Sequence, residues 1–421
     1  MEKDSKQYDL VVFGASGFTG QFMVEEVSRI ADEENLTWAI AGRNMSKLQK
    51  VLNEASTNSG KNLEETPIII ADVDSLKSLD EMASQARVIL NVCGPYTLFG
   101  EPVIRACIEH GTHHLDLCGE QEFLENMQLL YHSKAKENNV LIIGAAGTGC
   151  VGAEAGMLFM LDKFKDGQLT SVEAFLNVEF GPLGGGLNAG TFDSLIHSWG
   201  RSKELANIRQ QLFPEPLPQV AHKLPARSTV SFSEDTKLWC VPTAGVDNSV
   251  TERTIRDHLK TGVLKSPVEF FMYMCQPSWL ATWGLNLFTT ILHFLCFFSV
   301  GRWFLLKIFK NVKGPTREQI QGTSFSITYS GYGYDSVASA DAGEKPNRRV
   351  VAKMTGEEPF YISTSINLVQ GAVVILKEAK SLRHKGGVIT PGAAFFGTNL
   401  LERLEKCGVR ITTTSDTVEP N

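Results

Sequence analysis

The stretch Tyr8-Asp-Leu-Val-Val-Phe-Gly14-Ala-Ser-Gly17-Phe-Thr-Gly20 decides the fold of this chain. Leu10 to Phe13 form a continuous apolar run, which is typical of a strand buried on both faces. Three glycines then recur every third residue, a spacing that allows a tight turn and a close approach to a pyrophosphate. Gln21 to Ile30 continue with helical periodicity, and the amino end of such a helix favours an anion. We therefore predict a dinucleotide-binding loop, with an ordinary strand-to-helix turn as the alternative. The candidate cofactor-binding residues in it are Gly14, Ser16, Gly17, Phe18, Thr19 and Gly20.

A second strand and its loop follow in Trp38-Ala-Ile-Ala-Gly42-Arg43-Asn44. In dinucleotide folds this loop meets the adenosine ribose, and an NAD site usually places Asp or Glu there. Arg43, with Lys47 one turn further on, instead suits the 2′-phosphate of NADP. NADP is thus favoured over NAD as the cofactor. The alternative is that Arg43 is a solvated loop cation.

Four further apolar runs alternate with helical segments up to about residue 149. They are Pro67–Ala71, Val88–Val92, His113–Leu117 and Val140–Gly144. This alternation predicts an α/β fold with a doubly wound, Rossmann-type parallel sheet, occupying a dinucleotide-binding domain over residues 1–149. Asp72, at the end of the third strand, is a candidate contact for the adenosine half of the cofactor. It could equally cap the helix that follows.

The fourth strand ends in Cys93-Gly94-Pro95-Tyr96, at the edge of the sheet where open α/β sheets bind ligands. Gly94 and Pro95 are expected to shape the nicotinamide end of the site. Tyr96 is the candidate catalytic residue, which could donate a proton or position the substrate. A phenol with a pKa near 10 needs help to do so at neutral pH, and a tyrosine packed in the loop is the alternative.

No metal site is predicted. His113 and His114 are neighbours in a strand, so their side chains point to opposite faces and cannot share one ion without a distorted backbone. The eight cysteines are scattered and lack the paired short spacing of a zinc site.

The rest of the chain is expected to form a second domain and a terminal segment. Residues 150–360 predict a mixed α+β substrate domain, in which Ser324–Ser330 and Arg349–Met354 alternate like antiparallel strands. Residues 361–421 predict a C-terminal helical segment that packs back on the first domain. Within it, Gly386–Phe396 is expected to be a glycine-rich loop.

A hydrophobic membrane-attachment segment is predicted at residues 279–300, an uncharged run long enough for a bilayer core. Asn286, Thr289 and His293 interrupt it and argue against full spanning. Its cationic flank, suited to anionic lipid headgroups, consists of Arg302, Lys307, Lys310 and Lys313. We expect attachment to the cytoplasmic face of a membrane or lipid droplet, with a buried helix as the competing interpretation.

Composition excludes some partners. The net charge of −7 and pI near 5.8 argue against nucleic acid as a partner, because backbone binding needs clustered Lys and Arg. The first seven residues lack the apolar core of a secretory signal. The sequence leaves the oligomeric state open, a homodimer included.

These motifs together resemble the saccharopine dehydrogenase-like oxidoreductases, the animal, lipid-droplet-associated branch of the saccharopine dehydrogenase family. Besides the glycine loop, the resemblance rests on Ala41-Gly-Arg43, Asn91-Val-Cys-Gly-Pro-Tyr96, Gly100-Glu-Pro-Val-Ile104, Gly190-Thr191 and Gly387-Val-Ile-Thr-Pro-Gly-Ala-Ala394. It implies an oxidoreductase with an amino-terminal dinucleotide fold and association with lipid droplets or membranes. It implies no particular substrate.

One stretch departs from the resemblance. Where relatives have Phe-Asp-Ser-Ile-Pro-Ala-Asp or a close variant after a glycine, this chain has Gly147-Thr-Gly-Cys-Val-Gly-Ala-Glu154. The glycines at 149 and 152 are expected to enlarge the floor of the pocket. The second domain shows no obvious arginine constellation for saccharopine itself. Two hypotheses follow: an NADP-dependent oxidoreductase acting on a lipophilic substrate at a membrane or droplet surface, or a family member with lost turnover that binds a hydrophobic small molecule or lipid surface.

Overall fold

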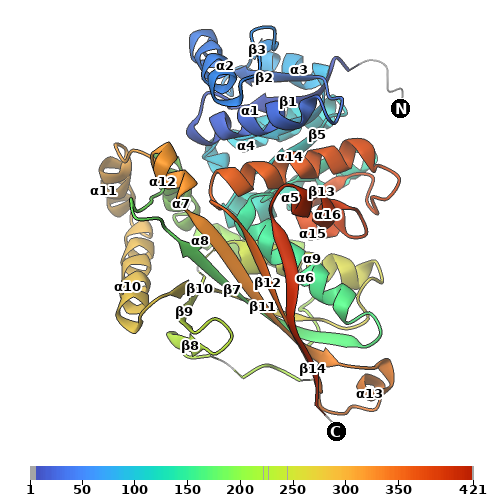
Figure 1. Ribbon diagram of the computed structural model, residues 1–421. Coiled ribbons are helices and arrows are strands. Elements are labelled where there is room, and N and C mark those ends of the chain that lie inside the picture. Colours follow the sequence, from blue (N-terminus) through green and yellow to red (C-terminus); the bar gives the residue numbers. More distant parts are fainter. Residues whose placement is uncertain (1–5, 221, 226, 244, 420–421) are drawn as a thin grey trace.

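The computed structural model describes residues 6–220, 222–225, 227–243 and 245–419, which build two seven-stranded sheets joined by helices (Figure 1). The strands of the first sheet are β1 (Tyr8–Phe13), β2 (Trp38–Gly42), β3 (Ile68–Ile70), β4 (Ala86–Asn91), β5 (His113–Asp116), β6 (Leu141–Ile143) and β13 (Gly387–Ile389). Their order in space is β3-β2-β1-β4-β5-β6-β13, and every pairing is parallel. The predicted α/β fold with a doubly wound parallel sheet is confirmed.

Helices cover both faces of this sheet, as the apolar run in β1 requires. Leu10 and Val12 pack toward α1, α2 and α14, whereas Val11 and Phe13 pack toward α3 and α4. The helices around this sheet are α1 (Phe18–Ala31), α2 (Met45–Ser59), α3 (Leu76–Gln85), α4 (Tyr96–Glu109), α5 (Gln121–Glu137), α14 (Ile362–Lys377), α15 (Pro391–Phe395) and α16 (Leu400–Lys406).

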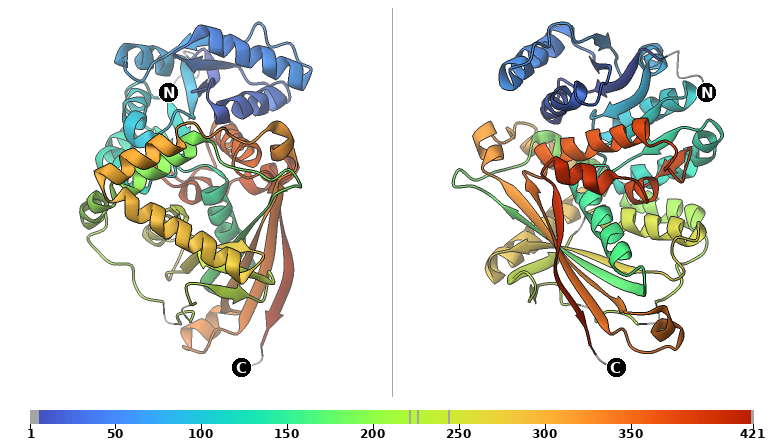
Figure 2. Two further views of the ribbon diagram at one scale, coloured as in Figure 1. Left: turned by 90° about the vertical axis from the view of Figure 1, so that its left-hand side faces the viewer. Right: turned by 45° about the vertical axis from the view of Figure 1, so that its right-hand side comes forward.

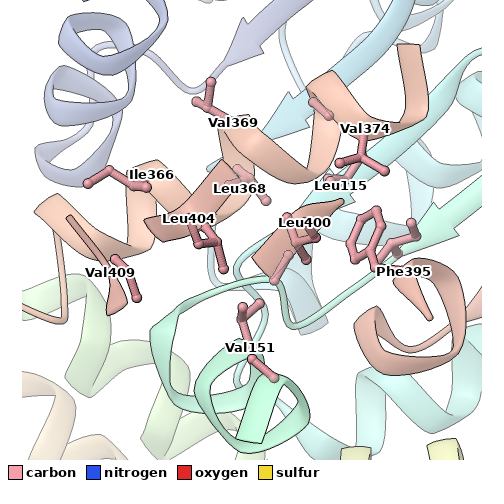
Figure 3. Close-up of a cluster of buried hydrophobic side chains, with 14 of the residues drawn as sticks. Leu115, Val151, Ile366, Leu368, Val369, Val374, Phe395, Leu400, Leu404 and Val409 are labelled. Atoms are coloured by element: carbon pink, nitrogen blue, oxygen red, sulfur yellow. The ribbon is translucent and has the colours of Figure 1, made fainter. Parts of the chain in front are cut away.

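The C-terminal segment contributes to both sheets. The helix α14 lies along α1, and its apolar side chains join those of α15, α16 and Val151 in a buried cluster (Figure 3). The expected glycine-rich loop at 386–396 is wrong in part, because β13 pairs with β6 through Gly387–Leu141 to Ile389–Ile143. The expected all-helical character of 361–421 is corrected as well, since β14 (Arg410–Val418) is a strand of the second sheet.

The second sheet is mixed, with the order β14-β12-β11-β7-β10-β9-β8. Its other strands are β7 (Gln168–Glu179), β8 (Ser231–Ser233), β9 (Leu238–Pro242), β10 (Glu269–Gln276), β11 (Ser324–Tyr334) and β12 (Arg348–Glu357). The predicted antiparallel pairing is confirmed in β11 and β12. The helices of this part are α6 (Thr148–Lys163), α7 (Ala189–Trp199), α8 (Ser202–Leu212), α9 (Asp247–Lys260), α10 (Trp279–Cys296), α11 (Ser299–Phe309), α12 (Arg317–Gln321) and α13 (Val337–Asp341).

The helix α6 links the two sheets, and its glycines permit close packing. A Cβ at Gly152 would lie 2.6 Å from Ile327 Cδ1, and a Cβ at Gly149 would lie 2.8 Å from Asp247 Oδ1. The Tyr329 hydroxyl donates to the Gly152 carbonyl at 2.7 Å. The expected enlargement of the pocket floor is therefore wrong, because side chains from β11 and α9 occupy the space that these glycines leave.

The helices α10 and α11 are joined by a short turn, meet at an angle and lie on the surface (Figure 2). We refer to this pair of helices as the α10–α11 hairpin. By length and composition α10 could cross a membrane, and only 17% of it is buried within the protein. Its buried side chains are Thr282, Leu292 and Cys296, whereas Leu287, Ile291 and Phe294 are at least half exposed. The competing interpretation of residues 279–300 as a buried helix does not match this exposure.

Candidate functional site

The candidate cofactor site lies at the carboxyl edge of the first sheet, where the loops after β1, β2, β4, β5 and β6 come together. Gly14 has a φ of 87°, a left-handed conformation that favours glycine. A Cβ at Gly20 would lie 2.4 Å from the Gly14 carbonyl oxygen, so a side chain there would collide with the turn. Gly14 and Gly20 thus allow the close contact between the end of β1 and the start of α1 that the sequence predicts.

The amino terminus of α1 is open to an anion. Its N-cap, Gly17, has no capping side chain, and the first turn of the helix contains no acidic residue. The free backbone N–H groups and the helix dipole there favour a phosphate. Ser16 lies in the preceding turn and Thr19 in the first helical turn, both half-buried. The donor set therefore fits the pyrophosphate of a dinucleotide.

Phe18 takes a structural position beside the loop. Its ring contacts Tyr361 with 4.8 Å between ring centroids, and a Cβ at Gly314 would lie 2.6 Å from it. The Tyr361 hydroxyl in turn accepts a hydrogen bond from the Asn188 amide at 3.0 Å. Tyr361, the N-cap of α14, and the second-domain residues Asn188 and Gly314 thus pack around Phe18 at the start of α1.

Arg43 and Lys47 are both exposed near the end of β2. Within the described ranges, neither side chain forms a hydrogen bond or an ion pair. Burial raises the pKa of Cys93, and the charge of Asp72 raises it further, whereas the charge of Arg43 lowers it. Because all three effects act on one thiol, Cys93, Arg43 and Asp72 lie near one another. Asp72 does not cap α3, whose N-cap is Ser75, and its carboxylate accepts from the Asp74 amide. Two unpaired cations therefore flank the adenosine end of the predicted site.

Gly94 is exposed and Pro95 is buried just before α4. The Tyr96 hydroxyl donates to the Asn91 carbonyl at 3.0 Å and accepts from the Leu117 amide at 3.2 Å. Burial raises the pKa of Tyr96 well above its usual value. With both main-chain bonds made, Tyr96 has the contacts of a tyrosine packed in the loop, which was the alternative interpretation, and its role as a proton donor stays a prediction.

Several polar residues that shape these loops were not predicted from the sequence. Asn91 and Asp116 are buried at the ends of β4 and β5, where their side chains accept from the amides of Cys93 and of Cys118 and Ala145. Burial raises the pKa of Asp116 to about 7. Both residues could have been found in the sequence as polar residues that end an apolar strand.

Glu120 is fully buried and precedes α5, but its side chain hydrogen-bonds to α4. Its carboxylate accepts from the amides of Tyr96 and Thr97 at 2.8 and 2.7 Å. It therefore caps α4, which has no capping side chain of its own. This cap fixes the Gly94–Pro95 loop, which is predicted to border the nicotinamide.

Three arginines of the second domain do come together, contrary to the sequence-based expectation. Arg209 binds Glu125 through two nitrogens, Arg256 pairs with Glu252, and Arg253 donates to Gln128. A carboxylate therefore pairs with Arg209 and with Arg256, whereas the hydrogen bond from Arg253 uses its Nε alone, and all three arginines line one pocket. No group of His, Cys, Asp or Glu side chains that could hold a metal is found within the described part of the chain.

Comparison with known proteins connects this geometry to a family. Residues 10–143 match the family model "Saccharopine dehydrogenase NADP binding domain", which indicates NADP as the cofactor. The chain is 40% identical to the saccharopine dehydrogenase-like oxidoreductase of Rattus norvegicus, covering 99% of both chains. It is 34% identical to the lipid droplet localized protein of Caenorhabditis elegans, covering 96% of this chain and 97% of that one. The apo saccharopine dehydrogenase (L-Glu forming) of Saccharomyces cerevisiae has the same fold, with a TM-score of 0.54 at 11% identity over 97% of this chain and 100% of that chain.

Proposed function

The chain belongs to the family of saccharopine dehydrogenase-like oxidoreductases, and from this premise we propose that it is an NADP-dependent oxidoreductase whose lipophilic substrate is presented at a membrane or lipid-droplet surface. Bound NADPH supplies a hydride, while the protein supplies placement. The glycine loop and the start of α1 would hold the pyrophosphate. Arg43 and Lys47 would hold the 2′-phosphate, and the Gly94–Pro95 loop would border the nicotinamide.

The observation that carries the lipophilic part is the position of α7, which joins the exposed hairpin to the nicotinamide end. On one side, Phe192 stacks on Phe309 of α11 with ring centroids 4.1 Å apart, and Ile196 packs with Leu292 and Leu305. On the other side, the Ser194 hydroxyl lies 3.5 Å from the place of a Cβ on Gly94. A substrate dissolved in the lipid around the hairpin would therefore reach the nicotinamide end of the cofactor site.

The hairpin has the surface of a lipid-contacting element. The exposed face of α10 continues on α11, and Trp303 lies beside Lys307, whose ammonium is 5.2 Å from the ring centroid. Aromatic and cationic side chains together suit the interface between hydrocarbon and headgroups. Similarity to the lipid droplet localized protein of Caenorhabditis elegans supports a droplet surface as the location.

Arg43→Ala is expected to weaken NADPH binding by roughly tenfold, which corresponds to about 1.4 kcal/mol, because one charge-assisted contact to the 2′-phosphate is lost. NADH binding should change little, since NADH lacks that phosphate. The measurement is an equilibrium titration with each cofactor, and Lys50→Ala on the same helix α2 as Lys47 is the control. An equal loss of affinity for both cofactors would assign Arg43 to the general shape of the site.

The proposed activity is tested by turnover. Purified protein is mixed with NADPH and phospholipid vesicles that carry long-chain aldehydes, ketones or unsaturated acyl compounds, and NADPH consumption and lipid products are measured. We expect consumption that depends on both the vesicles and the lipophilic compound. Saturable NADPH binding without consumption across such compounds would instead support the second hypothesis, a family member that binds without turnover, which the fully bonded Tyr96 hydroxyl favours.

A further inference from the structure

A small polar pocket of about 290 Å³ lies between α5, α8 and α9. Arg209 reaches it from α8, Arg253 and Arg256 reach it from α9, and Glu125 lies in its wall on α5. Its volume is below that of most drug-sized sites and suits an ion or a small polar molecule. No lining residue belongs to the glycine loop, to the loop after β2 or to the Gly94–Pro95 loop. The pocket is therefore separate from the predicted cofactor site.

Arg253 carries a buried charge without an ion-pair partner among the described residues. It is 6% exposed, and its Nε donates to the Gln128 side chain at 2.6 Å. Neither of its terminal nitrogens forms a hydrogen bond within the described ranges, yet neither is sealed off from solvent. Because Arg253 lines the pocket, a ligand there can bond to these two nitrogens.

The carboxylates near Arg253 offset its charge only in part. Glu125 and Glu154 raise the pKa of Arg253, but burial outweighs both and lowers it. Glu125 already accepts from Arg209 at 2.8 Å and from the Ser249 hydroxyl at 2.6 Å. Glu154 is partly neutral at pH 7, because burial raises its pKa to about 7. A buried cation with so little compensation is costly unless an anion binds it.

The charges that line the pocket also favour an anion. Three arginines face two glutamates, Glu125 and Glu252, which leaves one positive charge in excess. Nη1 of Arg209, like the terminal nitrogens of Arg253, forms no hydrogen bond within the described ranges. Guanidinium groups with free donors are the usual partners of phosphate and carboxylate groups.

We propose that this pocket binds a phosphate group, either free or as the ester of a small molecule, through Arg253 and Arg209. A phosphate group offers three or more acceptor oxygens, so it can bond to two guanidinium groups at once. A carboxylate has two oxygens and pairs with a single guanidinium edge, which would leave donors of the second arginine unused. The site is independent of the proposed oxidoreductase activity.

The test is equilibrium dialysis of the full-length protein against radiolabelled inorganic phosphate, with unlabelled glycerol 3-phosphate or acetate as competitors. Ala206→Glu places a carboxylate in the pocket from an exposed position on α8. Asn207→Glu, the control, places the same side chain at the neighbouring exposed position, which does not line the pocket. Arg253→Gln removes the buried charge. Gly17→Asp adds a carboxylate at the start of α1 and so tests whether phosphate binds at the cofactor loop instead.

We expect saturable phosphate binding whose affinity falls by at least about tenfold in Ala206→Glu and Arg253→Gln and stays unchanged in Asn207→Glu and Gly17→Asp. Acetate should compete at least about tenfold more weakly than phosphate, as a planar anion that pairs with one arginine. Competition by glycerol 3-phosphate identifies a phosphate ester as the ligand, and its failure to compete identifies free phosphate.

The proposal is overturned by absence of saturable binding, by equal affinity in Ala206→Glu and Asn207→Glu, by loss of binding in Gly17→Asp, or by stronger competition from acetate than from phosphate. If Arg253→Gln does not fold, the two exposed variants of α8 still decide the result. NADPH affinity is measured separately and should be unchanged in both of them, so failure of the cofactor site and failure of this phosphate site give different results.

Discussion

Gly17→Asp is expected to raise the Kd for NADPH by about 100-fold or more while leaving the free energy of unfolding nearly unchanged. Gly17 is the exposed N-cap of α1 and has a φ of −74°. A Cβ there would lie 3.2 Å from the Gly14 carbonyl oxygen, so the turn must shift slightly, a cost that the capping effect of aspartate offsets. An aspartate there would direct its carboxylate at the backbone N–H groups that are free for the pyrophosphate. Two like charges about 4 Å apart repel by about 4 kcal/mol near a protein surface, which exceeds the 2.7 kcal/mol that 100-fold requires.

The measurement is a titration followed by NADPH fluorescence, with urea unfolding as the test of stability. Leu130→Asp adds the same charge on the exposed surface of α5 and should leave the Kd unchanged. An unaltered affinity in Gly17→Asp, with the control also unaltered, would show that the cofactor phosphates do not lie at the start of α1.

The triple variant Leu287→Ser, Ile291→Ser and Phe294→Ser is expected to weaken association with phospholipid vesicles by about 1,000-fold or more. These side chains are 59%, 50% and 60% exposed on one face of α10. Burial of a large apolar side chain contributes about 1.5–3 kcal/mol, so three of them contribute at least about 4.5 kcal/mol, and serine retains almost none of it. Vesicle flotation or sedimentation measures the effect.

The matched control carries three Leu→Ser changes at exposed positions elsewhere. These are Leu76, Leu98 and Leu130. The control should bind vesicles like the wild-type protein, and both variants should remain folded because the changed positions lie on the surface. If the α10 variant and the control bind vesicles equally, the exposed hairpin face has another partner.

The sequence was sufficient to predict the first sheet because its strands are buried on both faces. Val11 and Val12 point to opposite faces of the sheet, and both faces are buried, so both residues must be apolar. The apolar run in β1 can therefore be recognised without knowing which helices cover the sheet. The strand β13 was missed because three residues in a glycine-rich stretch carry little periodicity, and its pairing with β6 depends on residues 246 positions away. The strand β14 is polar and exposed at a sheet edge, so no apolar pattern marks it.

The candidate site was predictable where backbone conformation demands a particular residue, as at Gly14 and Gly20. It was not predictable where a side chain acts across the fold. Glu120 caps α4 only because the loops after β4 and β5 are neighbours. Likewise, the filling of the space beside Gly152 by Ile327 requires the second sheet to be in place. Sequence spacing carries no information on such long-range contacts.

Equilibrium titration of the purified wild-type protein with NADPH and with NADH tests the cofactor site most directly. We predict saturable binding of NADPH, at least about tenfold tighter than NADH, because the two unpaired cations Arg43 and Lys47 meet the 2′-phosphate. Absence of saturable NADPH binding, or tighter binding of NADH, would contradict the assignment of this edge of the sheet as an NADP site.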